Sequence, residues 1–342
     1  MIIPGGSDKL LEDFRKRPRD ARLALYAGAA LEDVGRIEHA VAVWSLGDDA
    51  DRQLRRVKDN PNAPEDMRRL SARADKAMRK HFTRLHTEAI SSLEKTAGGK
   101  LDRVKNAIWS LTHDGEVAFR EPMQKPVIFY MPDLPAAPVT SNEQLPWAAA
   151  LEAAWTEIRR EYEEAARANI AMQPYVPAAT REKKWAHLRG RLDWSSIHIY
   201  KDAVETPAAA RFPRTVAALQ NVDLVRIDET PLEAFFSRLK PGARIPPHYG
   251  LTNTRLTAHL PLIVPDDCAI RVGNELCHWT EGKIVAFDDS YNHEAWNKSS
   301  TDRVVLIFEA HHPNLTTAER AAVEHAYSVR RHWLQNRWRL LG

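Results

Sequence analysis

The stretch FFSRLKPGARIPPHYGLTNTRLTAHLPLIVP, residues 235–265, sets the pattern of the second half of the chain. Short apolar runs alternate there with Gly, Pro and Asn, which is typical of short strands joined by turns. Similar runs extend from about residue 195 to Glu309, with turns such as Pro265-Asp266-Asp267 and Gly273-Asn274-Glu275 between them. Strands this short favour a double-sheet jelly roll. The pattern predicts strands near 195–200, 223–228, 234–239, 255–263, 269–272, 283–287 and 303–309.

Residues 1–115 have a helical pattern instead. Small and apolar residues recur at helical spacing over residues 20–51, and a longer apolar stripe follows Pro64. Gly28 and Trp44 belong to a set spaced as in a tetratricopeptide-type helical hairpin. Two interpretations stay open, a tetratricopeptide-like hairpin and an ordinary helical bundle, because a single repeat lacks the neighbours that bury its faces.

A proline-rich stretch, FREPMQKPVIFYMPDLPAAPVTSNEQLPW at 119–147, lies between the helical and the strand-rich parts. Its six prolines indicate an extended crossing between them. We therefore expect a helical domain over residues 1–115 and a second domain over residues 116–342. Amphipathic helices are expected up to about residue 171 and at the C-terminus, where they would flank the strands.

Basic residues are concentrated in the helical part. Residues 52–84 contain eleven Lys and Arg against four Asp and Glu, a local charge of +7. Such a run is either a docking face for an acidic protein partner or the solvated face of long helices. Both interpretations stay open.

The overall composition excludes several classes of protein. Among the 342 residues, 49 Lys and Arg against 46 Asp and Glu leave a charge of only +3, so nothing suggests a nucleic-acid partner. Two cysteines, Cys268 and Cys277, exclude a disulfide-rich scaffold and any Cys₄ metal site. No apolar run approaches the roughly 18 residues that span a bilayer, and the first residues lack a secretory signal, so we expect a cytoplasmic protein.

Two of the fourteen histidines have neighbours that suggest chemistry. His248 stands in RIPPHYG, after two prolines that fix the backbone, and His293 stands in FDDSYNHEAWN. Imidazoles from separate strands of one barrel can converge on Fe(II), Zn(II) or Cu(II). A zincin motif is excluded, because Asn297 takes the place of its second histidine. Taken singly, each histidine is more often structural than a ligand.

The segment 235–315 resembles the aspartyl/asparaginyl β-hydroxylase family of Fe(II)- and 2-oxoglutarate-dependent oxygenases. The stretch at 235–265 carries the resemblance together with CAIRVGNE, WTEGKIVAFDDSYNHEAWN and DRVVLIFEAHHPNL. A weaker likeness covers roughly 122–320. The resemblance implies an α+β protein, with an N-terminal α-helical domain followed by a double-stranded β-helix (jelly-roll) oxygenase domain and flanking helices.

By the same resemblance, His248 and His293 are the iron ligands. Many related oxygenases have a carboxylate two residues after the first histidine, but that position is Gly250 here. The iron would then be held by two histidines and water. Asp289 either anchors that water or stabilises the turn of the FDDS segment, and both interpretations stay open.

The resemblance also assigns the cosubstrate. Arg303 would bind the distal carboxylate of 2-oxoglutarate, unless it is a surface arginine that pairs with Asp302. Ser237 would add a hydroxyl at the same end, and His259 would contact the carboxylate beside the keto group.

One departure concerns the substrate. The animal enzymes of the family have a second basic residue two positions before the equivalent of His259, where this chain has Thr257. Threonine cannot form a forked pair with a carboxylate, so an aspartate of an epidermal-growth-factor-like domain is an unsafe substrate assignment. Arg255 binds an acidic group of the substrate or is an arginine on the face of a strand.

The sequence therefore predicts a dioxygenase that uses Fe(II), 2-oxoglutarate and O₂ to hydroxylate an unactivated C–H bond. The leading substrate is the β-carbon of an Asp- or Asn-type residue in a peptide or protein. A free or carrier-bound amino acid, or a lipid acyl chain, is the alternative, and a catalytically silent binding protein is a further one.

Overall fold

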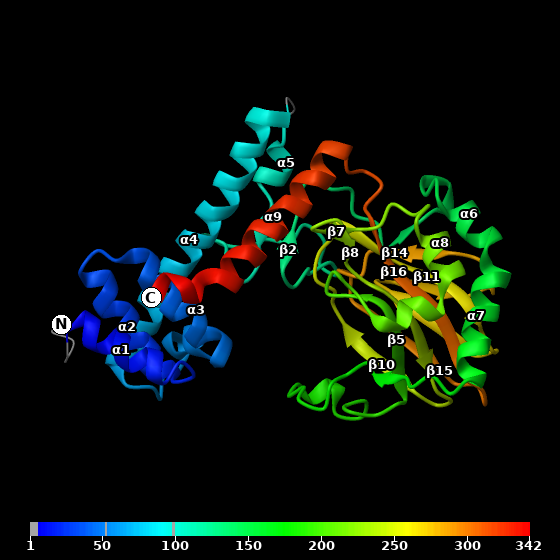
Figure 1. The fold of residues 1–342 in the computed structure, drawn as a ribbon, viewed down its shortest axis with the longest axis horizontal. Coiled ribbons are helices and arrows are strands. Elements are labelled where there is room, and N and C mark those ends of the chain that lie inside the picture. The colour runs from blue at the N-terminus through cyan, green and yellow to red at the C-terminus, as the bar shows by residue number, and fades with distance from the viewer. Residues whose placement is uncertain (1–5, 52, 98–99) are drawn as a thin grey trace. The chain divides into compact units, whose positions relative to one another are not determined.

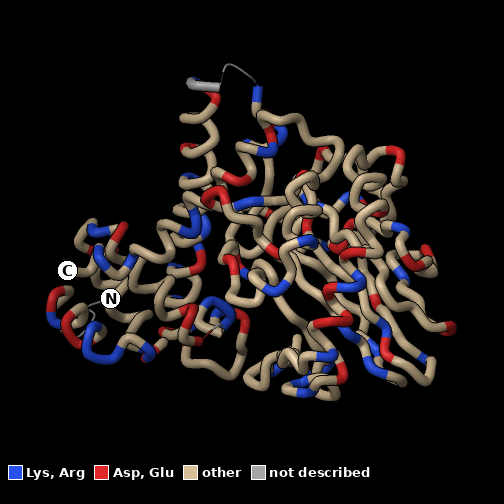
Figure 2. The backbone as a smooth tube through the Cα atoms, turned by 45° about the vertical axis from the view of Figure 1, so that its right-hand side comes forward, with Lys and Arg blue, Asp and Glu red and all other residues tan. Residues whose placement is uncertain are grey.

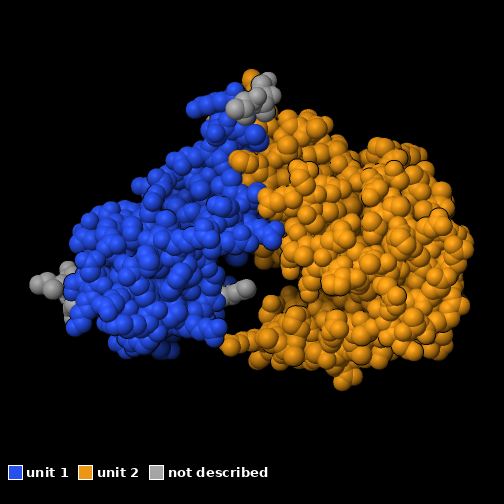
Figure 3. Space-filling view, viewed as in Figure 1, with its two compact units in different colours: residues 1–98, 111–117, 326–342 blue, residues 99–110, 118–325 orange. Residues whose placement is uncertain are grey.

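The structure is a computed structural model that describes residues 6–51, 53–97 and 100–342 (Figure 1). It divides into two compact units (Figure 3): residues 1–98, 111–117 and 326–342 form the first, and residues 99–110 and 118–325 the second. The predicted division at residue 115 differs from this one, because residues 326–342 belong to the first unit and residues 99–110 to the second. The position of the domain boundary stays a prediction.

The first unit is helical. Asp20 caps α2, because its Oδ1 atom accepts a hydrogen bond from the backbone N–H of Leu23. That N–H has no acceptor within the first turn of the helix. Gly28 of α2 lies against Trp44 of α3, and a Cβ at Gly28 would come within 2.3 Å of the indole Nε1. The predicted hairpin is therefore present, while its tetratricopeptide type stays a prediction. The helices are α1 (Ser7–Lys16), α2 (Ala21–Asp33), α3 (Ile37–Ala50), η1 (Leu54–Asp59), α4 (Glu65–Ala97), the last part of α9 (Thr317–Asn336) and η5 (Arg337–Leu341).

Several basic residues of the stretch 52–84 form ion pairs within the unit itself. Lys58 and Arg79 both pair with the buried carboxylate of Asp75, and Arg73 pairs with Glu32 and Asp33. Acidic residues are interspersed with basic ones along the chain, as Figure 2 shows. Docking of a protein partner on this face stays a prediction.

The second unit is built around two antiparallel sheets. The larger one has the strand order β3-β14-β11-β16-β9-β5-β4, with β6 paired to β5, and the smaller one has the order β10-β15-β12-β13. The strands are β3 (Val139–Thr140), β4 (Gln173–Pro174), β5 (Trp194–Lys201), β6 (Val204–Glu205), β9 (Ala234–Leu239), β10 (Arg244–His248), β11 (Arg255–Ile263), β12 (Cys268–Val272), β13 (Glu275–His278), β14 (Val285–Phe287), β15 (His293–Asn297) and β16 (Arg303–His311).

Smaller elements complete this unit. Two pairs of short strands lie outside the main sheets, β1 (Ile108–Trp109) with β2 (Phe129–Tyr130) and β7 (Arg226–Ile227) with β8 (Thr230–Pro231). The helices are α5 (Asp102–Lys105), η2 (Asn142–Gln144), α6 (Ala148–Ala153), α7 (Trp155–Arg167), η3 (Lys183–Trp185), η4 (Pro207–Arg211) and α8 (Pro213–Leu219). Within the described residues, no helix is long and apolar enough to cross a bilayer.

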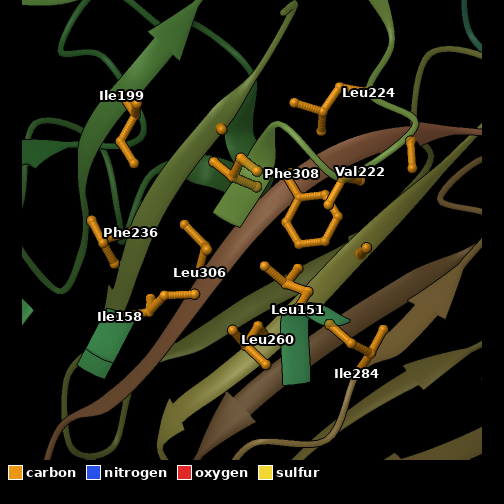
Figure 4. Close-up of a cluster of buried hydrophobic side chains, with 14 of the residues drawn as sticks. Leu151, Ile158, Ile199, Val222, Leu224, Phe236, Leu260, Ile284, Leu306 and Phe308 are labelled. Atoms are coloured by element: carbon orange, nitrogen blue, oxygen red, sulfur yellow. The ribbon is translucent and has the colours of Figure 1, made fainter. Parts of the chain in front are cut away.

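Two hydrophobic clusters cover the two faces of the larger sheet. Phe236, Leu260 and Leu306 pack against Leu151 of α6 and Ile158 of α7 on one face (Figure 4). The other face meets the smaller sheet, where a second cluster includes Leu239, Phe287, Ile245, Ile270 and Ala295. Successive residues of a strand point to opposite faces, so each strand serves both clusters. Two facing sheets with helices on one outer side form the predicted double-stranded β-helix, and the fold class is confirmed.

Most predicted strands are present, and two strands that carry site residues, β10 and β15, were not predicted. The segments 234–239 and 255–263 coincide with β9 and β11, and four others agree within a few residues. The segment 223–228 contains only the two-residue β7. The sequence analysis missed β10, β13 and β15, because the two prolines of β10 and the polar residues of β15 obscure the alternation.

Candidate active site

The two candidate metal ligands face each other across one strand pair. His248 ends β10 and His293 begins β15, and the antiparallel register places them directly opposite one another. Their ring centroids are 4.0 Å apart. The register shifts between Ile245 and His248, where Pro246 and Pro247 interrupt the ladder because proline has no N–H to donate. The predicted convergence of the two imidazoles is therefore observed.

Both rings are fixed in the same tautomer. His248 Nδ1 donates to the carbonyl of Pro246 at 2.8 Å, and His293 Nδ1 donates to the carbonyl of Tyr291 at 2.9 Å. A carbonyl can only accept, so each Nδ1 carries the proton and each Nε2 keeps its lone pair. Burial lowers the pKa of His248 to about 3 and also lowers the pKa of His293. Both imidazoles are therefore neutral, which is the form that binds metals.

The histidine pair opens into a cavity between the two sheets. Its walls are mostly apolar and aromatic, with charged groups at a few positions, as is usual for sites that bind small molecules. The lining residues are Tyr175, Trp194, Glu233, Phe235, Ile245, His248, Thr257, His259, Ile270, Phe287, Asp289, His293, Ala295, Arg303, Ile307 and Glu309.

Asp289 lies where a side chain at position 250 would otherwise be. A Cβ added to Gly250 would stand 2.0 Å from the carboxyl carbon of Asp289. The Oδ1 atom of Asp289 is buried without a hydrogen-bond partner. The turn of the FDDS segment is held instead by Asp288, which accepts hydrogen bonds from the backbone N–H and the hydroxyl of Ser290. The carboxylate of Asp289 lines the cavity, and its role stays a prediction.

These donors fit an Fe(II) ion. Non-haem Fe(II) oxygenases commonly hold their metal with two histidines and a carboxylate, and here two neutral imidazoles lie in one cavity with the carboxylate of Asp289. The unpartnered Oδ1 of Asp289 can accept a hydrogen bond from water on the metal. Within the described residues, no group of three or more His, Cys, Asp or Glu side chains is placed to hold a metal. On the family resemblance, His248 and His293 would be the two direct ligands.

Arg303 is a buried cation without a counter-ion. Its side chain is 1% exposed, and its Nε and Nη1 atoms have no hydrogen-bond partner. The guanidinium carbon lies 4.9 Å from the ring centroid of Trp279, and burial lowers the pKa of Arg303 to about 10. Asp302 pairs with Arg238 instead, which excludes the interpretation of Arg303 as a surface arginine. A buried, uncompensated charge is costly, so this group favours an anion in the cavity.

His259 and Ser237 lie near Arg303 in the fold. His259 lines the cavity, its Nδ1 is buried without a partner, and burial holds its pKa well below the ordinary value. Ser237 is fully buried on β9, opposite Val305 of β16, and its hydroxyl accepts a hydrogen bond from the indole of Trp194 at 3.1 Å. Ser237 is not among the described residues that line the cavity.

Arg255 is engaged with an acidic residue. Its guanidinium lies 2.9 Å from Oε1 of Glu309, and both side chains are nearly buried. Glu309 lines the cavity opposite Thr257 in the β11–β16 register, whereas Arg255 does not appear among the described lining residues. The arginine proposed from the sequence to meet substrate is thus already paired with a carboxylate.

Comparison with known proteins finds relatives for part of the chain. Residues 152–313 match the family model for aspartyl/asparaginyl β-hydroxylases. The chain is 35% identical over 176 residues to an ornithine lipid ester-linked acyl 2-hydroxylase of Rhizobium tropici. It is 32% identical over 217 residues to human aspartate β-hydroxylase domain-containing protein 2, and 35% identical over 143 residues to mouse aspartyl/asparaginyl β-hydroxylase.

This part of the chain belongs to the aspartyl/asparaginyl β-hydroxylase family. The matches cover 50%, 61% and 40% of this chain, respectively. They span only 59%, 56% and 19% of the lengths of the three relatives. The predicted family is confirmed.

Among solved structures, a prolyl-4-hydroxylase of Pseudomonas putida is 18% identical and covers 48% of this chain and 88% of its own, with a TM-score of 0.28. A 2-oxoglutarate–Fe(II) oxygenase family protein of Burkholderia pseudomallei is 12% identical and covers 46% and 91%, with a TM-score of 0.27. The strand order described above establishes the fold of the second unit independently of these scores.

The sequence analysis missed the acidic residues of the cavity. The sequence does not single out Glu233 or Glu309 as site residues, because isolated acidic residues within strands are common. The signal that was present is the period of two along β16, where Arg303 and Glu309 are separated by six residues and so share a face. The roles assigned to individual site residues stay predictions.

Proposed function

We propose that the chain is an Fe(II)- and 2-oxoglutarate-dependent dioxygenase that hydroxylates an unactivated C–H bond. One observation carries the proposal. A single cavity contains two neutral imidazoles whose Nδ1 atoms donate to backbone carbonyls and, farther along it, the buried and uncompensated cation of Arg303. A metal ligand pair and an anion site in one apolar cavity suit an iron ion and a dicarboxylate cosubstrate.

Each residue then has a definite task. His248 and His293 hold Fe(II) through Nε2, and Asp289 accepts a hydrogen bond from water on the metal. Arg303 binds the distal carboxylate of 2-oxoglutarate, and His259 contacts the carboxylate beside the keto group. With O₂, the bound iron and 2-oxoglutarate supply the oxidising chemistry that converts C–H to C–OH and yields succinate and CO₂.

The apolar walls support this chemistry. Ile245, Ile270, Phe287 and Ile307 line the cavity and give it apolar walls. In a dry site the interaction of a guanidinium with a carboxylate is stronger than in bulk water. The same walls protect a reactive centre from side reactions with water.

The substrate is the open part of the proposal. The sequence favours the β-carbon of an Asp- or Asn-type residue, in line with the name of the family. The similarity to a lipid acyl 2-hydroxylase, at 35% identity, supports an acyl chain as a second candidate.

Anaerobic titration tests the proposal before any substrate is known. Purified protein with Fe(II) should develop a visible metal-to-ligand charge-transfer band when 2-oxoglutarate is added. We expect His293→Ala to abolish the band, because it removes one of two protein ligands. His278→Ala is the matched control, since His278 is exposed on β13. A wild-type protein that gives no band, or a His293→Ala variant that keeps it, contradicts the proposal.

A further inference from the structure

The two ends of the cavity carry opposite charges. Strand β16 runs along the cavity, and Arg303, Ile307 and Glu309 all line it because they share one face of the strand. The six residues from Arg303 to Glu309 span roughly 20 Å in an extended strand. The cosubstrate proposed for the Arg303 end leaves the Glu309 end for the substrate.

Carboxylates dominate this far end. Glu309 and Glu233 both line it, and Asp289 contributes a third carboxylate beside the histidine pair. The side chain of Glu309 is 11% exposed, and its Oε2 atom is buried without a hydrogen-bond partner. Its Oε1 atom is the one that pairs with Arg255. An unpartnered carboxylate oxygen in a closed cavity favours a donor from a ligand.

Cations at this end do not balance the carboxylates. Arg255 pairs with Glu309 and, like Lys201, also opposes the rise in the pKa of Glu233, whereas Thr257, directly opposite Glu309, is uncharged. His198 Nε2 lies 3.6 Å from Glu233, but burial lowers the pKa of His198 to about 4, so that it is neutral near pH 7. Burial also raises the pKa of Glu233 and Glu309 to about 7, as expected for carboxylates that lack sufficient cations.

We propose that the substrate end of the cavity binds a cationic nitrogen group, an amine or a guanidine, through Glu309 and Glu233. This inference rests on the proposed function, because it names the substrate class of that same site. A free carboxylate would face Glu309, Glu233 and Asp289 together, and like charges in a poorly solvated site repel strongly. An ammonium or guanidinium would supply the missing donor to Oε2 of Glu309.

A second hollow continues from this end. It shares Tyr175 and Glu233 with the cavity and is lined mainly by residues of β4, β5 and η4, including Pro174, Ile197 and Ala208. Glu233 therefore stands where the two spaces meet. The hollow gives the remainder of a substrate a partly apolar surface beside the acidic group.

Three capped amino acids test the charge preference. They are the Nα-acetyl, N-methylamide forms of L-lysine, L-norleucine and L-aspartate, of which norleucine matches lysine without its amine. Binding is followed by saturation-transfer NMR on the metal-free protein and by perturbation of the anaerobic Fe(II)–2-oxoglutarate charge-transfer band. We expect the lysine form to bind roughly ten- to a hundredfold more tightly than the norleucine form, as for a charge-assisted hydrogen bond. The aspartate form should bind most weakly.

Substitutions of the two glutamates test whether they cause the tighter binding of the lysine form. Glu309→Gln should reduce lysine binding to the norleucine level and improve aspartate binding, since Arg255 then lacks its counter-ion. Glu233→Gln should weaken binding of the lysine form without disturbing the Arg255–Glu309 pair. If Glu309→Gln does not fold, this variant tests the cationic preference by itself. Glu275→Gln, on the exposed part of β13, should change nothing.

The outcomes separate this inference from the proposed function. Equal binding of the lysine and norleucine forms, or tighter binding of the aspartate form, overturns the cationic preference even when the charge-transfer band is present. Absence of the band overturns the oxygenase proposal, and NMR binding to the metal-free protein still decides whether the acidic end selects cations.

Discussion

At the scale of single residues, Gly250 and Asp289 form one unit. A side chain at position 250 would displace the Asp289 carboxylate, because its Cβ would stand 2.0 Å from the carboxyl carbon. We expect Gly250→Ala to weaken Fe(II) binding about ten- to a hundredfold, as losses of groups that orient metal ligands do. Because the alanine acts by moving Asp289, the double variant Gly250→Ala, Asp289→Ala should bind Fe(II) no worse than Asp289→Ala alone. Additive losses in an Fe(II) titration contradict this coupling.

The buried charge of Arg303 has a consequence for stability. Arg303→Met should raise the free energy of unfolding of the ligand-free protein by about 1 kcal/mol or more, because it removes an uncompensated buried cation. The same change should weaken 2-oxoglutarate binding roughly ten- to a hundredfold. Denaturant unfolding and the anaerobic titration measure the two effects separately.

Arg255→Met is the matched comparison for Arg303→Met. It should lower stability, since it leaves Glu309 buried without its cation, and it should leave 2-oxoglutarate binding nearly unchanged. If Arg255→Met stabilises the protein or abolishes 2-oxoglutarate binding, the roles assigned to the two arginines are wrong.

Glu233 should make stability depend on pH. Burial raises its pKa from 4.5 to about 7, so the folded protein binds more protons than the unfolded chain between these values. Stability therefore falls as pH rises from about 4.5 to about 7 and levels off above that range. Glu233→Gln should gain thermal stability relative to the wild type across this window, whereas Glu275→Gln should not. If the difference in thermal stability between Glu233→Gln and the wild type does not change with pH, the raised pKa of Glu233 is contradicted.

At the scale of elements, the sequence located the long strands better than the short ones. Strands β9, β11 and β16 are apolar and lie in the middle of the larger sheet, so hydrophobic runs predict them. Strands β10 and β15 carry the two histidines but also Pro246, Pro247 and Glu294, and their pairing depends on the rest of the barrel. The histidine pair was therefore predicted from family motifs. Only the folded strands show that the two histidines lie opposite each other in the register of β10 and β15.

The site also contains residues that the sequence predicted and an ion pair that it could not predict. His248, His293, Asp289, His259 and Arg303 line one cavity, as the sequence motifs indicated. The ion pair of Arg255 with Glu309 could not be predicted, because it depends on the register of β11 against β16. A register shift of one residue would place either side chain on the opposite face of the sheet.

The α2–α3 pair offers a test of close helix packing. Gly28→Ala should lower the free energy of unfolding by about 1–3 kcal/mol, because its Cβ would meet the Trp44 indole at 2.3 Å. Gly6→Ala is the control, since an added Cβ there meets nothing within 4 Å. Equal stability of the two variants by thermal unfolding would show that α2 and α3 do not pack this closely.

At the scale of the whole molecule, the two units keep separate hydrophobic cores. The core of the helical unit includes Leu341, from the end of the chain, together with Leu25, Leu31 and Trp44 from α2 and α3. Arg337 of η5 adds a hydrogen bond to the hydroxyl of Ser45 at 3.0 Å. The helical unit is thus completed by the last residues of the chain, whereas the site residues all belong to the other unit.

Leu341 and its neighbour Leu340 test this division. Leu341 is 1% exposed and Leu340 is 37% exposed, so the two differ in burial rather than in chemistry. Leu341→Ala should destabilise the helical unit by about 2–5 kcal/mol, and Leu340→Ala should have little effect. Because the cavity lies in the second unit, the charge-transfer band with Fe(II) and 2-oxoglutarate should persist in Leu341→Ala. Loss of the band at the temperature where the helical unit unfolds would show instead that the site depends on the helical unit for its integrity.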